Sequence, residues 1–239
     1  MSKLVKKSEI REYIKYASGE ILLTVIGIII GLQVHVWTEK RTEKNEVETI
    51  VGNLYDEFIQ NKENLEETVK RVQFSMDNAK NVISLVGKPK AELLTYNLDS
   101  LLAVSFAYKK FNPSQDVINV LIESGRLKLI ENDAMRDALY NWASNDITLN
   151  DRFTDLNTHT NTVFAYLAQN YSLKDLDYYT SERLLGKSHL KIDKTAIFED
   201  IVFENHLDNE IYYLHSYLEV LKITSGIIDE IVENSKQYR

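Results

Sequence analysis

The chain has 239 residues, a formal net charge of −8 at neutral pH, eight glycines, two prolines and no cysteine. The lack of cysteine excludes disulfides, thiolate metal sites and thiol nucleophiles, and the acidic balance disfavours non-specific binding to nucleic acid. So few glycines and prolines argue against an all-β sandwich or barrel, whose many turns need both residues. The hydrophobic fraction of 44% is sufficient for a packed core, so we expect a folded chain.

The clearest feature of the sequence is an apolar run near its start. Residues 21–36 read ILLTVIGIIIGLQVHV and contain no charged side chain. As a helix, the longer segment 16–37 would span roughly 33 Å at about 1.5 Å per residue, enough for a bilayer core of roughly 30 Å. Tyr13, Tyr16 and Trp37 stand where interfacial aromatic anchors belong. We therefore predict a transmembrane helix over residues 16–37.

Two other structures could contain such a run. A buried helix of a soluble domain is less favoured, because few such helices are apolar on all sides. A cleaved signal peptide would share the basic start and the apolar run. However, the residues that follow are Trp37, Thr38 and Glu39, and they contain no small-residue cleavage motif. An uncleaved signal anchor is the better prediction.

The distribution of basic residues predicts the orientation of this anchor. Residues 1–15 carry five basic side chains, and the twenty residues after Trp37 carry three. Since basic flanks favour the cytoplasmic side, we expect residues 1–15 to form a basic, amphipathic cytoplasmic segment. Residues 38–239 have 23 basic and 33 acidic side chains, a net charge of −10, and would form a periplasmic domain held in the bacterial inner membrane.

Small and acidic residues inside the predicted span are candidates for a function in the membrane. Gly27 and Gly31 form a small-xxx-small motif that lets two helices pack closely in lipid, so we expect a homo-oligomer. Alternatively, the two glycines face only lipid or a neighbouring loop. Glu20 and Thr24 share their face, and an acid inside a membrane is by default a candidate ion or proton site. At the level of the head groups, Glu20 would instead pair with Lys15 or with neighbouring amides.

Gln33 and His35 are the other polar side chains of the span. They lie near its far boundary, where we expect them to reach water or to form hydrogen bonds between helices. Because polar residues occur along one face of the span, a second hypothesis stays open. In that hypothesis the protein is a subunit of an ion- or proton-conducting oligomer, lined by the face of Glu20 and Thr24.

A long helix should follow the span. Apolar residues recur at spacings of three and four from Val47 to Val86, and Asn61 takes one of these places. This heptad-like stripe predicts a stalk helix, which a break near Gly52 could interrupt. Gly87 and Pro89 are typical of a helix end.

The rest of the sequence also predicts helices. In chain order we expect helices over about 91–108, from Pro113 to Ser124, and after the N-cap Asn132. Two more should cover about 148–171 and the stretch from the N-cap Ser172 to about Leu185. After a loop over Gly186–Asp193, one helix or a pair should run from about Lys194 to the end. No alternating strand pattern longer than four residues occurs. Long amphipathic helices with short links predict an all-α fold with an antiparallel helical bundle domain.

Two polar clusters outside the span need an interpretation. Glu204, His206, Asp208 and Glu210 alternate with other residues. Side chains two apart on a helix point roughly 200° apart, so these four cannot converge on a metal, and we expect a solvated face. His159 lies in a polar patch that could bind a small ligand or a partner, be exposed, or pair with another helix. No catalytic or cofactor motif occurs, so we expect no enzyme activity, no cofactor and no metal.

Two blocks of residues carry a resemblance to a known family. The first block reads Tyr16-Ala17-x-Gly19-Glu20-Ile21-x-Leu23, then Val25-Ile26-Gly27-Ile28, Leu32-Gln33 and Trp37-x-Glu39-x-Arg41. The second comprises Asn112-Pro113-Ser114, then Ser124-Gly125-Arg126-Leu127-Lys128-Leu129-Ile130, with Asn132 and Arg136. Together with the final helix from about Tyr212, these blocks resemble short membrane proteins from Bacteroidota that are classed only as a domain of unknown function. The resemblance implies a single-pass envelope protein with a helical domain, and it implies no activity and no catalytic residue.

These features together predict a membrane-anchored, non-enzymatic, all-α protein of the bacterial envelope. We expect it to act as a scaffold, a sensor or an interaction protein. Its expected partners are the lipid bilayer, further copies of itself and another envelope protein, but not nucleic acid.

Overall fold

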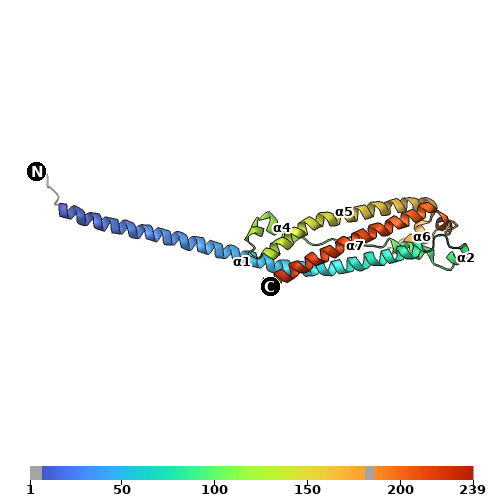
Figure 1. Cartoon of the computed structure of the whole chain (residues 1–239), viewed down its shortest axis with the longest axis horizontal. Helices are drawn as coiled ribbons and strands as arrows, with labels where there is room; N and C mark the ends of the chain where they lie inside the picture. Colours follow the sequence, from blue (N-terminus) through green and yellow to red (C-terminus); the bar gives the residue numbers. More distant parts are fainter. Residues whose placement is uncertain (1–6, 181–185, 239) are drawn as a thin grey trace. The chain divides into compact units, whose positions relative to one another are not determined.

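The computed structural model describes residues 7–180 and 186–238, and every regular element within these ranges is helical. The all-α prediction is therefore confirmed. The chain divides into two compact units, Met1–Ile50 and Val51–Arg239. Helix α1, Lys7–Ile83, contributes residues to both of them (Figure 1).

Helix α1 is continuous over 77 residues, so the predicted long helix after the span exists. The break considered near Gly52 does not occur. One glycine inside a helix costs about 1 kcal/mol, and burial of the neighbouring Val51 and Leu54 outweighs that cost. After α1, the chain turns at Gly87, whose φ of 74° favours glycine. The N–H of Gly87 donates to the carbonyl oxygen of Phe198 at 2.8 Å, which fixes this turn.

The described residues after α1 form six α-helices and three 3₁₀-helices. They are α2 (Lys90–Leu93), α3 (Leu98–Ser105), α4 (Asp116–Glu123), η1 (Arg126–Leu129), α5 (Asp133–Asn170), α6 (Leu173–Asp177), η2 (Ala196–Glu199), α7 (Ile201–Ser235) and η3 (Lys236–Tyr238). Within the second unit, α5, α7 and the later part of α1 lie lengthwise beside one another (Figure 1).

Two of the predicted helix caps are confirmed. The side chain of Asn132 accepts a hydrogen bond from the N–H of Met135 at the start of α5. The side chain of Ser172 accepts one from the N–H of Asp175 at the start of α6. The predicted loop over 186–193 is also free of helix. Each of these predictions depended on a local signal, a capping residue or a glycine, which acts within a few residues of itself.

Several predicted boundaries are wrong. The segment 91–108 forms two helices, because the side chain of Asn97 caps α3 by accepting from the N–H of Ser100 at 3.2 Å. The two helices expected on either side of residue 148 are one, α5, of 38 residues. Helix α6 ends at Asp177 instead of continuing to about Leu185, which lies outside the described residues.

Contacts between α5 and α7 occur in opposite order along the two helices. Going up α5, Asn145 donates to Thr224 at 2.8 Å and Thr160 donates to Glu210 at 2.8 Å. Further on, Tyr166 donates to Asp200 at 2.6 Å. The residue numbers rise on α5 while they fall on α7. These polar contacts therefore fix the register of the two helices.

Helix α1 contacts both of these helices within the second unit. The rings of Phe58 in α1 and Trp142 in α5 meet edge to face, with centroids 4.8 Å apart, and both are buried. Lys62 in α1 forms an ion pair with Asp229 in α7 at 2.6 Å. Because the aromatic pair is buried and the ion pair is exposed, the packing of the rings contributes most of the stability here.

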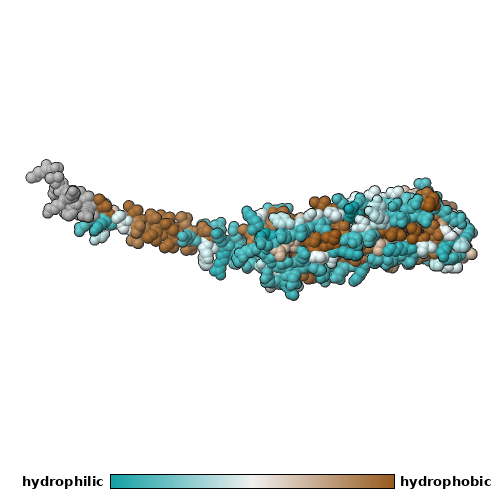
Figure 2. Space-filling view, viewed as in Figure 1, coloured by the Kyte–Doolittle hydropathy of each residue, from teal (hydrophilic) through white to brown (hydrophobic). Residues whose placement is uncertain are grey.

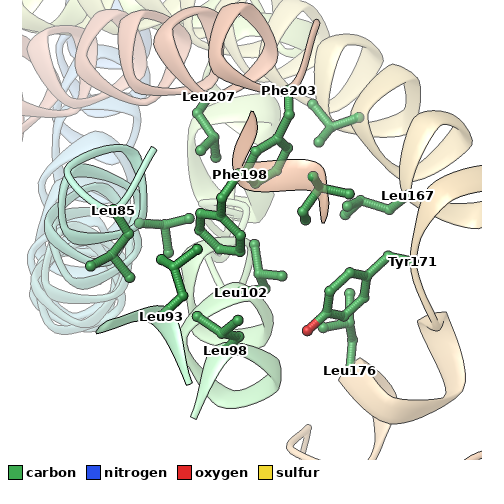
Figure 3. Packing of buried hydrophobic residues seen from close by; sticks show 13 residues of the cluster. Leu85, Leu93, Leu98, Leu102, Leu167, Tyr171, Leu176, Phe198, Phe203 and Leu207 are labelled. Carbon is green, nitrogen blue, oxygen red and sulfur yellow. The ribbon is translucent and has the colours of Figure 1, made fainter. Parts of the chain in front are cut away.

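A buried apolar cluster lies where the short helices α2, α3 and α6 meet the ends of the long ones (Figure 3). Its labelled members are Leu85, Leu93, Leu98, Leu102, Leu167, Tyr171, Leu176, Phe198, Phe203 and Leu207. Full burial of one such side chain contributes about 1.5–3 kcal/mol. Helices of four to eight residues are unstable by themselves, so α2, α3 and α6 depend on this cluster.

A buried ionic group holds the loop before α7 against α3 and α6. The ammonium of Lys194 lies 2.7 Å from both Asp99 and Asp175, which are nearly fully buried. The hydroxyl of Tyr171 donates to Asp99 at 2.7 Å, and the N–H of Ser188 donates to Asp175 at 2.7 Å. Burial acts to raise the pKa of Asp175, but the hydrogen bonds from Lys194 and Ser188 outweigh it and lower this pKa.

Side chains of α1 bind an irregular segment, residues 107–115, that connects α3 to α4. Asn61 donates to the carbonyl of Ser114 at 2.8 Å and accepts from its N–H at 2.8 Å. Asn64 donates to the carbonyl of Asn112 at 2.9 Å. Since the core-facing Asn61 satisfies both backbone groups of one residue, it replaces the regular hydrogen bonds that this segment lacks.

The position of α4 is set by the same stretch of α1. The buried carboxylate of Glu57 accepts from the hydroxyl of Ser114 at 2.5 Å and from the N–H of Asp116 at 2.7 Å. An acid at a helix N-terminus satisfies free N–H groups and interacts favourably with the helix dipole. Helix α4 therefore begins at Asp116, and the prediction of a start at Pro113 is wrong.

We predict that Asn61→Ala lowers the free energy of unfolding of the second unit by about 1–3 kcal/mol, because it removes two hydrogen bonds to the backbone of Ser114, each worth about 0.5–1.5 kcal/mol. The measurement is denaturant unfolding of the full chain in detergent, followed by the fluorescence of the buried Trp142 in a Trp37→Phe background.

The matched control is Asn150→Ala. The amide of Asn150 is exposed and bonds only to the carbonyl of Asp146 in its own helix. This variant should change stability by less than about 0.5 kcal/mol. Equal effects of the two variants would show that Asn61 does not hold the segment.

Candidate functional site

The first unit contains a candidate membrane span. Among the described residues, the helical stretch Glu12–Ile83 has an 18-residue window with a mean hydropathy of 2.0, and none of that window is buried. Figure 2 shows this window as a band of apolar surface with polar surface on both sides. A core helix of a soluble protein would bury such a window. Length, composition and exposure therefore identify one helix able to cross a membrane.

The predicted packing motif lies on this exposed helix. A Cβ atom added at Gly27 or Gly31 would meet no other atom within 4 Å. The described chain thus leaves the glycine face uncovered. Substitution of either glycine by a larger residue would not disturb the packing of the described chain. An effect of such a variant on self-association would therefore come from contacts between copies.

The polar residues of the span are also exposed. Thr24 donates from its hydroxyl to the carbonyl of Glu20 at 2.9 Å, so its own helix satisfies it. The carboxylate of Glu20 has no hydrogen-bond or ion-pair partner within the described residues, and the alternative pairing with Lys15 is not formed. Gln33 and His35 lie exposed near the far end of the apolar run. Their roles remain predictions.

The predicted aromatic anchors, Tyr13, Tyr16 and Trp37, are all exposed on α1, with exposed fractions of 76%, 80% and 62%. The guanidinium of Arg41 lies 5.6 Å from the ring centroid of Trp37, one turn further along the helix. A cation over an indole face is favourable, and both groups suit the level of lipid head groups.

A second candidate is a buried acid between α5 and α7. Glu210 is fully buried, and the hydroxyl of Thr160 lies 2.8 Å and 3.1 Å from its two carboxyl oxygens. The same hydroxyl lies 3.0 Å from the carbonyl of Leu156. The hydroxyl of Tyr108, from the irregular segment 107–115, donates to the Thr160 oxygen at 2.8 Å. Three parts of the chain therefore converge on one acidic group.

Two histidines flank this acid. The Nε2 of His159 donates to the carbonyl of His206 at 3.0 Å and lies 3.9 Å from the second carboxyl oxygen of Glu210. The rings of His159 and His206 have centroids 5.9 Å apart. Burial, and then the neighbouring His159, lower the pKa of His206. We name the residues Tyr108, His159, Thr160, His206 and Glu210 the buried Glu–His cluster.

The cluster can satisfy either protonation state of its acid. When Glu210 is ionised, the Thr160 proton points to the carboxylate. When Glu210 is neutral, its own proton can go to the Thr160 oxygen, and Thr160 then donates to the carbonyl of Leu156. Burial raises the pKa of Glu210 to about 7, although the hydrogen bond from Thr160 opposes this shift. The acid therefore titrates near neutral pH.

These contacts correct one interpretation of the sequence and resolve another. Glu210 does not lie on a solvated face, because it occupies a core-facing place of α7 between Leu207 and Leu214. The polar patch around His159 pairs with another helix, which was one of the alternatives. No group of three or more potential metal ligands occurs in the described ranges. The spacing of three and four that joins Glu210 to its buried neighbours was the signal that could have found it.

Comparisons of the chain with protein-family models, with curated proteins and with solved structures find no match.

We predict that Glu210→Gln removes a pH dependence of stability. The raised pKa of Glu210 means that the folded state holds its proton while the unfolded state, with a pKa near 4.5, loses it. Native stability should thus fall as the pH rises from about 4.5 to 7, by roughly 3 kcal/mol in total. Glu210→Gln does not undergo this loss. In denaturant unfolding, the difference in free energy of unfolding between the variant and the native chain should therefore shift by this amount in favour of the variant between pH 4.5 and pH 8.

Two features isolate this effect. His206 acts in the opposite direction. Because its pKa is lower in the folded state, the protein loses stability as the pH falls. His206 is present in both chains, so its effect cancels in their comparison. Glu219→Gln, an exposed change on the same helix, should show no such gain above about pH 5. A constant difference between Glu210→Gln and native chains across this range would show that the acid is ionised throughout.

Proposed function

We propose that the protein is a single-pass membrane protein of the bacterial inner membrane, in which residues 16–37 of α1 anchor a helical domain. Its function would be that of a homo-oligomeric scaffold, sensor or interaction protein of the envelope. The observation that carries the proposal is the apolar window of α1, none of which is buried.

The proposed orientation places the N-terminus in the cytoplasm and residues 38–239 in the periplasm. The support is the excess of basic residues before the span and the acidic charge after it.

The proposed architecture of the second unit is an antiparallel bundle of α1, α5 and α7. The reverse order of the contacts between α5 and α7 supports it. The aromatic contact of Phe58 with Trp142 adds α1 to the same core. Such a bundle presents long polar faces, which suit a scaffold or an interaction protein.

The proposed oligomer would form through Gly27 and Gly31. Both glycines are exposed and leave a groove in which a second helix can approach closely, as dispersion forces in lipid require. Because the chain has no cysteine, one cysteine at Val34, on the same face, would report this contact by oxidative crosslinking.

We predict that Gly27→Leu with Gly31→Leu lowers the crosslinking of a Val34→Cys chain in native membranes by about fivefold or more, because two leucines prevent close approach of the helices. Val25→Leu with Ile29→Leu, on the opposite face, is the matched control and should leave crosslinking unchanged. Equal crosslinking of the two double variants would contradict the glycine-face interface.

A conducting oligomer lined by Glu20 and Thr24 is the second candidate, favoured by the carboxylate of Glu20, which lies on the glycine face and has no partner among residues 7–180 and 186–238. We predict that vesicles containing the native protein show no ion or proton flux above that of empty vesicles. A flux that Glu20→Gln removes, while crosslinking at position 34 persists, would establish the conducting oligomer in place of the scaffold.

A further inference from the structure

A cavity in the second unit lies apart from the buried Glu–His cluster. Its volume is about 420 Å³, and its walls come from α1, α3, α5, α6 and the residues that follow α3 and α6. Aromatic and aliphatic side chains dominate these walls, namely Phe74, Ala103, Phe106, Phe164 and Leu176. Both the size and the apolar lining are typical of small-molecule sites, which measure about 300–1,000 Å³.

One cation of this cavity is unpaired. Arg71 lines it, and its guanidinium forms no hydrogen bond or ion pair within the described residues. The acid one turn before it, Glu67, is already held by Lys109 at 2.8 Å. A guanidinium beside an apolar wall provides a planar pair of donors for a carboxylate.

Three phenyl rings form the aromatic wall of the cavity, those of Phe74, Phe106 and Phe164. The rings of Phe106 and Phe164 have centroids 5.2 Å apart and are tilted by 56°, and both are only partly buried. Phe74 is 49% exposed on the α1 side of the cavity. Exposed phenyl rings around a cavity favour a ligand whose body is itself flat and apolar.

The other polar lining groups limit the charge of the ligand. The hydroxyl of Tyr179 already contacts Lys187 at 2.9 Å and Asn97 at 3.0 Å, so it is engaged. Asp177 contributes an exposed carboxylate to the lining. Asp177 repels every negative charge in the cavity, and Arg71 can compensate for one of them. The cavity therefore suits a ligand with a single acidic group.

We propose that this cavity binds a small aromatic monocarboxylate, with its ring against Phe74, Phe106 and Phe164 and its carboxylate on Arg71. The proposal supplies a ligand class for a helical sensor domain. It stands on the cavity alone, so it holds whether or not the first unit crosses a membrane.

The test uses isothermal titration calorimetry on the full chain in lipid nanodiscs, with empty nanodiscs as the blank. The probes are naphthalene-2-carboxylate and its uncharged analogue naphthalen-2-ylmethanol. We expect Arg71→Gln to weaken binding of the carboxylate by about tenfold or more, as expected for loss of a charge-assisted hydrogen bond, and to leave binding of the alcohol unchanged.

Arg152→Gln is the matched control. Arg152 is an exposed arginine whose ion-pair partner in the described part of the chain is Asp155 on its own helix, and its loss changes the net charge by the same amount. It should affect neither probe. Equal weakening by Arg71→Gln and Arg152→Gln would overturn the proposal, as would the absence of binding heat from the carboxylate above the blank.

A second pair of variants tests the cavity itself. Ala107→Leu places a larger side chain at an exposed position of the lining, and it should weaken binding of both probes. Asp177→Asn removes the repelling charge and should tighten binding of the carboxylate only. Unfolding followed by Trp142 fluorescence shows that each variant is folded. Unchanged binding of both probes to folded Ala107→Leu would place the ligand elsewhere and contradict the proposal.

Discussion

The exposed apolar surface of residues 21–36 is the constraint on which the rest depends. Its leucine, isoleucine and valine side chains are 43–71% exposed. Apolar surface left in water costs about 25 cal/mol per Å², so this stretch needs a cover that the described chain does not provide. The helical backbone satisfies its own hydrogen bonds, which is the condition for lying in lipid. After residue 50, the same helix buries only one face, because there its partners are α5 and α7.

Polar side chains at core-facing positions give the second unit its specific arrangement. Asn61 binds an irregular segment to α1, and Asn145 and Thr160 pair with α7. Each of these hydrogen bonds would be lost if one helix shifted by one turn against the other. An apolar contact, in contrast, could be replaced by a contact with the next apolar side chain on the same face. Glu210 adds an acid that titrates near neutral pH to the same core. Buried polar groups of this kind can cost stability and still select one register.

Local patterns in the sequence were enough to predict the all-α class, a long apolar helix near the start of the chain, and the caps at Asn132 and Ser172. Two of the errors concern polar residues that stand in a buried stripe. Asn145, between Trp142 and Leu149, bonds to Thr224, and α5 continues past residue 148, where the sequence predicts a new helix. The solvated face was expected because Glu210 alternates with other acidic and histidine residues, but Glu210 bonds to Thr160 across the pair of helices. Their partners are 50 or more residues away, so single-helix periodicity could not reveal them.

Fractionation of cells that express the intact, tagged chain tests the membrane assignment most directly. After lysis without detergent, ultracentrifugation and an alkaline carbonate wash, we predict that the protein stays in the membrane pellet and dissolves only with detergent. The alkaline wash removes proteins that are held to the membrane only by charged contacts, so retention in the pellet would indicate a span. Recovery of the full-length chain in the supernatant would contradict a bilayer-spanning α1.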